Sequence, residues 1–216
     1  MSRISKTLLI AGALGLAVTA IPAQAEQGDW LLKGGVTTVS PDSNNLKVVD
    51  GEDVLKLSVG DGTSFGFTIT QMVTDNFGVE LLAAWPFKHD IKAKVNGGGL
   101  GKIAEVEHLP PTLSLQYHFL PDTFLTPYVG VGVNWTTFTS EKINSGVADG
   151  LSLDDSFGLA GQVGVDLNLG DWILNADVRY IDISSKAKIK VDGEWSKLGT
   201  VSIDPIVYSL MVGYRF

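Results

Sequence analysis

The segment 63–85, TSFGFTITQMVTDNFGVELLAAW, alternates apolar and small polar side chains on both sides of a short turn. Before the turn, Phe65, Phe67 and Ile69 share one face, while the positions between them hold glycine or threonine. The residues TDNF at 74–77 supply the aspartate and asparagine that favour tight turns. Because successive side chains of a strand point to opposite faces, the segment predicts two antiparallel strands.

The same alternation recurs through the chain, and the connections between the alternating segments differ regularly in length. Those after the second, fourth and sixth segments are short, whereas the others are long. Short periplasmic turns and long extracellular loops are typical of outer-membrane barrels. The sequence therefore predicts an all-β fold, an eight-stranded antiparallel transmembrane β-barrel. Its strands are expected at 30–39, 63–73, 78–85, 112–119, 128–138, 156–167, 172–182 and 205–216, and its long loops at 42–62, 87–111, 140–155 and 183–204.

The first residues have the features of a secretory leader. Two basic residues precede an apolar stretch at 8–21, which is shorter than the about 20 residues that a membrane helix needs. The small-residue motif Ala-Gln-Ala at 23–25 then fits a cleavage site. We therefore expect a cleaved signal peptide at 1–25 and a single barrel domain at 26–216.

Charge and cysteine content exclude two classes of function. Loss of the leader removes two of the 16 basic residues and none of the 24 acidic ones, so the mature chain is strongly acidic. This argues against nucleic acid as a partner, since binding it requires a basic face. The chain has no cysteine, which excludes disulfides and thiol chemistry. No cofactor is predicted.

A soluble eight-stranded barrel shows the same alternation, so other features must decide between the two. Here the polar face is rich in glycine, alanine and serine, which suits a narrow interior. The final Phe216 resembles the terminal signal that barrel assembly machinery recognises, and the aromatic residues at strand ends resemble interface girdles. We therefore expect a location in a bacterial outer membrane, in contact with lipid and lipopolysaccharide. The girdle residues are Trp30, Trp85, Tyr128, Trp135, Trp172, Tyr180 and Tyr214.

The inward face carries both charges and glycines. The charges either line a wet path or satisfy one another in a plugged anchor. The glycines are expected to leave space in the lumen. The inward charges are Lys33, Glu80, Asp166, Asp177, Arg179 and Arg215, and the inward glycines are Gly35, Gly66, Gly130, Gly132, Gly158, Gly164 and Gly213.

Three prolines stand at facing ends of the third and fourth strands. Pro86 follows the third strand, and Pro110 and Pro111 precede the fourth. Proline donates no hydrogen bond to a strand ladder, so pairing is expected to fail there. One hypothesis is a lateral opening through which a ligand leaves the lumen for the membrane. Termination of the loops by proline explains the same residues equally well.

Catalytic activity is not expected. Ser114 and His118 share a face, but four residues of a strand separate them by about 13 Å, too far for a hydrogen bond. No G-x-S-x-G motif occurs. A metal site is a weak alternative. His89 and His108 flank one long loop and could approach, near Asp90 or Glu107, although loop histidines are usually just solvated.

Several strings of the chain together resemble the OmpW family of outer-membrane proteins. The resemblance covers essentially the whole mature chain. It implies an eight-stranded barrel with a narrow, largely hydrophobic channel that passes small hydrophobic molecules, with alkane uptake in the AlkL relatives and a lateral exit into the membrane. The strings are TDNFGVELLAAWPFKHDI at 74–91, EHLPPTLSLQYHF at 107–119, PYVGVGVNWTTF at 127–138, DDSFGLAGQVGVD at 154–166 and VGYRF at 212–216.

The resemblance also implies a constriction. In the family an inward leucine and an inward tryptophan pinch the lumen, and these map onto Leu82 and Arg179. An arginine in place of the aromatic could bridge Glu80 or Asp177 and form a charged gate. The predicted function is a channel for passive uptake of small hydrophobic or amphiphilic molecules. The alternative is a barrel that transports nothing and acts as an anchor, receptor or adhesin through its loops.

Overall fold

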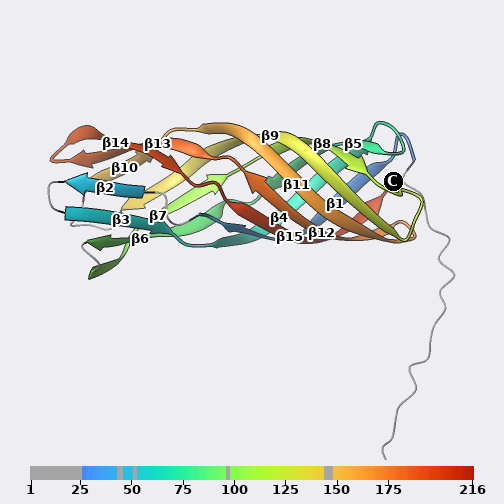
Figure 1. Ribbon diagram of the computed structural model, residues 1–216, viewed down its shortest axis with the longest axis horizontal. Helices are drawn as coiled ribbons and strands as arrows, with labels where there is room; N and C mark the ends of the chain where they lie inside the picture. The colour runs from blue at the N-terminus through green and yellow to red at the C-terminus, as the bar shows by residue number, and fades with distance from the viewer. Residues whose placement is uncertain (1–25, 43–45, 51–52, 96–97, 144–147) are drawn as a thin grey trace, which may run out of the picture.

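Eight long strands close into an antiparallel barrel in the computed structural model, which describes residues 26–216 except 43–45, 51–52, 96–97 and 144–147 (Figure 1). Each strand pairs with its neighbours around the ring, and pairing of the fifth with the sixth closes it. The predicted eight-stranded barrel is therefore confirmed. In chain order its strands are β1 (Trp30–Ser40), β4 (Gly62–Met72), β5 (Phe77–Ala84), β8 (Thr112–His118), β9 (Leu125–Ile143), β11 (Ser156–Leu169), β12 (Trp172–Ile181) and β15 (Ile206–Arg215).

The four long connections lie at one end of the barrel, as the sequence predicts, but much of their length forms strands. Their described residues form seven further strands that extend the barrel wall beyond the membrane-facing part (Figure 1). One group continues from β9 in the order β7, β6, β3, β2, and the other is a three-stranded sheet. We call these strands the extension. They are β2 (Leu46–Asp50), β3 (Asp53–Val59), β6 (Phe87–Val95), β7 (Gly98–Leu109), β10 (Gly150–Leu153), β13 (Ser184–Val191) and β14 (Glu194–Ser202).

The outer surface of the eight-stranded part is apolar. Val131 and Leu210, for example, expose 69% and 70% of their surface, while inward Lys33 exposes 1%. Packed aromatic groups mark the two edges of this belt, with Trp172 against Tyr214 at one and Trp135 against Phe157 at the other. A soluble barrel would turn its apolar face inward, so this surface is one for lipid.

The two ends of the described chain meet at the short-turn edge of the barrel. The backbone N–H of Trp30 donates to the carbonyl of Phe216, and the reverse bond forms as well. This edge lies opposite the extension (Figure 1). The predicted leader at 1–25 lies outside the described residues. The part of the chain that the structure describes contains no helix long and apolar enough to span a bilayer.

The inward glycines do not leave the space expected of them. A Cβ added to Gly164 would collide with the ring of Tyr128, and one added to Gly130 would meet the side chain of Gln162. At these two positions a large side chain of a neighbouring strand lies across the sheet surface, whereas a Cβ added to Gly35 or Gly158 would meet neighbouring backbone. The glycines make room for a packed interior instead of an empty one.

Candidate functional site

A buried ion pair crosses the barrel at mid-height. Nη2 of Arg179 on β12 donates to Oε1 of Glu80 on β5 at 2.7 Å, and it lies 3.6 Å from Oδ1 of Asp177. The two strands are four places apart in both directions around the ring, so the pair spans the full lumen. Burial makes an unpaired charge costly, which explains why both carboxylates gather on one arginine.

A second polar layer lies towards the periplasmic edge and is joined to the first. Lys33 Nζ is 3.5 Å from Oδ1 of Asp166, which also accepts a 2.7 Å hydrogen bond from Asn175. Asn175 donates in turn to the hydroxyl of Tyr128 at 2.9 Å, and this hydroxyl donates to Asp177 at 3.2 Å. The lower half of the lumen is therefore filled by a connected polar network.

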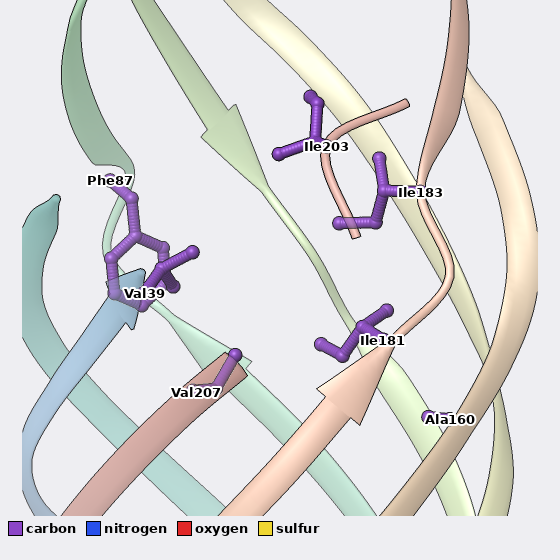
Figure 2. Packing of buried hydrophobic residues seen from close by; sticks show 7 residues of the cluster. All are labelled: Val39, Phe87, Ala160, Ile181, Ile183, Ile203 and Val207. Atoms are coloured by element: carbon purple, nitrogen blue, oxygen red, sulfur yellow. The ribbon is translucent and has the colours of Figure 1, made fainter. Parts of the chain in front are cut away.

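An apolar layer covers this network on the extracellular side. Val39, Phe87, Ile181 and Val207 are among its members, and their side chains point into the space between the strands (Figure 2). Val207 of this apolar layer is the cross-strand partner of Arg179. The lining of the lumen therefore changes from charged to apolar between directly adjacent residues. Inward Leu82, which the resemblance assigns to a constriction, is also buried.

Above this layer the extension encloses a cavity of about 130 Å³. Aliphatic and aromatic side chains from several strands form almost all of its wall, with Val201 and Ile203 shared between the cavity and the layer beneath it. The extension thus reverses the polarity of the membrane part, since it buries apolar residues and turns lysines outward. An apolar solute entering from outside would find a matching site here.

The barrel wall is interrupted beside the apolar layer. Pairing of β5 with β8 ends at Leu82–Thr112, and pairing resumes between β6 and β7 at Phe87–His108. Among the described residues, no cross-strand pair joins 83–86 to 109–111. Each edge of the interruption stays bonded to the strand on its far side. Trp85 N–H donates to the Phe65 carbonyl of β4, and the N–H of Trp135 on β9 donates to the Pro111 carbonyl.

The three prolines singled out in the sequence lie at this interruption. Pro86 belongs to one edge, and Pro110 and Pro111 belong to the other. Their missing N–H groups remove the donors that a continuous ladder would need. The backbone therefore provides an unpaired stretch where the wall meets the upper edge of the lipid belt, close to exposed Trp85.

Two histidines meet at the cavity wall. Nε2 of His89 on β6 lies 2.9 Å from Nε2 of His108 on β7, and both side chains are buried rather than solvated as expected. Burial lowers the pKa of both imidazoles, that of His108 to about 3. The acidic residues near this pair in the sequence bind other side chains, and Asp90 forms an ion pair with Lys102 at 2.6 Å. Within the described ranges, no three metal-binding side chains come together.

The geometry defines a class of protein, an eight-stranded outer-membrane β-barrel with a charged lower lumen and an apolar upper cavity. The model of the OmpW family matches residues 26–216. The chain belongs to this family and resides in the bacterial outer membrane.

Individual relatives agree with this assignment. Outer membrane protein W of Vibrio cholerae is 41% identical over 215 residues, covering 94% of this chain and 97% of that protein. Outer membrane protein AlkL of Ectopseudomonas oleovorans is 32% identical, covering 88% and 83%. The crystal structure of OprG from Pseudomonas aeruginosa superposes with a TM-score of 0.79 at 36% identity, covering 90% of this chain and 98% of that one.

Proposed function

We propose that this protein is a channel for passive uptake of small hydrophobic or amphiphilic molecules, which leave it sideways into the membrane between β5 and β8. The observation that carries the proposal is the position of the unpaired wall. It lies next to the apolar layer below the cavity and above the charged network. The similarity to AlkL, together with the hydrophobic channel that the family implies, supports an apolar solute.

The polar network favours a sideways path over a straight one. A solute without polar groups would have to break the pair of Arg179 and Glu80 and leave both charges without partners. Exposing a buried charge to an apolar neighbour is costly, whereas passing between 83–86 and 109–111 breaks no backbone ladder. In this proposal Leu82 and the charges of Arg179, Glu80 and Asp177 form the constriction, and Pro86, Pro110 and Pro111 border the exit.

A covalent clamp across the interruption tests the exit. Cysteines replacing Trp85 and Leu109 would stand on its two edges, and a short bis-maleimide can join them where a disulfide cannot reach. The chain has no native cysteine, so the reagent can react only with the two introduced cysteines. We expect the clamped protein to lose uptake of a labelled alkane by whole cells, and the uncrosslinked protein to retain it.

The matched control places cysteines at Leu81 and Leu113, which already face one another in the paired part of the same seam. Clamping this pair should leave uptake unchanged. Equal uptake with both clamps would reject lateral release. A barrel that takes up no apolar solute in any form would favour the anchor or receptor function. Contact of Phe216 with assembly machinery, and of the outer surface with lipopolysaccharide, belongs to the same proposal.

A further inference from the structure

The apolar cavity contains a polar pair whose chemistry the uptake function does not by itself require. The side chains of His89 and His108 expose 1% and 2% of their surface, and both line the cavity. Their rings stack with centroids 4.8 Å apart and planes 16° from parallel. Phe87 also stacks on His108, with the ring centroids 5.7 Å apart. The pair is thus held rigidly by aromatic neighbours.

The hydrogen bonds of this pair fix the position of each proton. Nδ1 of His89 lies 2.7 Å from the carbonyl oxygen of Gly60, which can only accept, so Nδ1 carries the hydrogen. Neutral His89 then presents a lone pair at Nε2. The 2.9 Å contact between the two Nε2 atoms requires a hydrogen, which His108 must therefore supply.

This arrangement leaves a lone pair on Nδ1 of His108. The atom is buried and has no hydrogen-bond partner among the described residues. Phe87 and Phe138, the aromatic neighbours of His108, offer no donor. The low pKa of His108 keeps the ring neutral at pH 7, so Nδ1 keeps its lone pair. Nδ1 has essentially no accessible surface in this structure, so a donor reaches it only when a neighbouring side chain of the cavity moves aside. A buried acceptor without a donor is destabilising, and an incoming donor would remove that cost.

We propose that Nδ1 of His108 is a recognition point, so that the cavity prefers apolar solutes bearing one O–H or N–H donor over solutes of the same shape without it. Small alcohols, phenols and indoles belong to this class. The inference rests on the proposed uptake function and names its preferred solute. His89 and Gly60 act as positioning groups, because they hold His108 in the tautomer that accepts.

Indole and N-methylindole are suitable probes, because methylation removes the N–H donor and leaves the ring system intact. In lipid nanodiscs, ¹⁵N labelling of histidine reports the tautomer of each ring, and the chain has three histidines. We expect His108 to carry its hydrogen on Nε2 and His89 on Nδ1. Indole should shift the Nδ1 resonance of His108, and N-methylindole should bind without that shift, while His118 serves as the internal reference.

Two substitutions separate the acceptor from the packing of the ring. His108→Gln can still donate to His89 but has no acceptor near the former Nδ1, whereas His108→Asn keeps an acceptor there. We expect the wild type to bind indole about three- to tenfold more tightly than N-methylindole, the effect of one neutral hydrogen bond. The preference should vanish in His108→Gln and persist in His108→Asn. Lys197→Gln changes an exposed residue outside the cavity lining and should leave this preference intact.

The possible failures are distinguishable. Equal binding of both probes to the wild type, a hydrogen on Nδ1 of His108, or a preference that survives in His108→Gln would overturn the recognition point alone. No binding of either probe would overturn it together with the cavity's role in uptake. If indole is preferred but the clamp of Trp85 and Leu109 does not reduce uptake, recognition stands and lateral release is rejected.

Discussion

Arg179 and Glu80 lie on opposite sides of the barrel, and their 2.7 Å ion pair crosses the lumen between them. On each strand the next inward residue towards the extracellular side is apolar, Leu82 after Glu80 and Ile181 after Arg179, so the ion pair lies directly beneath apolar side chains. The pair thus occupies the place where the family resemblance implies an aromatic constriction. A charged closure differs from an aromatic one because it can yield to water and small ions once a partner is removed.

Replacement of Arg179 by alanine should raise single-channel conductance in planar bilayers. The change removes the side chain that crosses the lumen and frees two carboxylates that water can then solvate. Lys197→Ala is the control, because Lys197 is an exposed cation of the extension. Unchanged conductance in Arg179→Ala, with the barrel folded, would show that Arg179 does not constrict the path.

The period of two was enough to predict the barrel strands, but not those of the extension. In β13, Ala187 and Ile189 face the cavity while lysines occupy the positions between them, and Asp192–Gly193 forms a turn with positive φ at both residues. The sequence thus contains both features that indicate a hairpin, the alternation of apolar and polar residues and a turn with glycine. The outward residues of β13 are charged, whereas outward residues of the membrane part are apolar, so the pattern that predicts the membrane strands does not extend to β13.

The contacts between side chains across the lumen could not be predicted from the sequence. Charges on β5 and β12 are 99 residues apart, and which of them meet depends on the stagger of the strands around the ring. The approach of His89 and His108 could be anticipated from their places beside one loop. Their burial could not, because it follows from the extension that encloses them.

Acid should loosen the extension around the histidine pair. The folded-state pKa of His108, about 3, lies below the ordinary value of 6.5, so the folded state binds fewer protons between these values. Burial also lowers the pKa of His89, although Asp61 and Asp90 oppose the shift. The stabilising effect of the neutral rings is therefore complete above pH 6.5 and falls as pH drops towards 3, by on the order of 3 kcal/mol at pH 4.

Amide hydrogen exchange of β6 and β7 at pH 7 and pH 4, corrected for intrinsic rates, measures this loss. His108→Phe keeps an aromatic ring and removes the titrating group, so most of the difference between the two pH values should disappear. Exchange protection that is independent of pH in the wild type would contradict the assignment of two neutral buried rings.

Gly164→Ala should destabilise the barrel by about 1–3 kcal/mol, since overpacking forces neighbours out of place. The added Cβ would collide with the ring of Tyr128, which lies across Gly164 from the neighbouring strand. Gly161→Ala, on the same strand, has no heavy atom within 4 Å of the added carbon and is the control. Urea unfolding in detergent compares them, and equal midpoints would mean that Tyr128 moves aside freely.

Tyr128→Phe should weaken the link between the two polar layers. Its hydroxyl accepts from Asn175 and donates to Asp177, so its loss leaves a buried carboxylate oxygen without that donor. We expect a loss of about 1–3 kcal/mol in the free energy of unfolding, the usual effect of leaving a buried polar group unsatisfied. The phenyl ring still fills the volume beside Gly164, so the change reports the hydrogen bonds and not the packing.

Tyr180→Phe is the matched control for this substitution, because the ring of Tyr180 is on the outer surface and 47% exposed. It should change the unfolding midpoint little. If the two variants are equally stable, Tyr128 acts as a space-filling ring and the two layers are independent. If Tyr128→Phe is the less stable and also conducts more than the wild type, the hydroxyl holds Asp177 in place beside Arg179. The lower network then supports the charged closure above it.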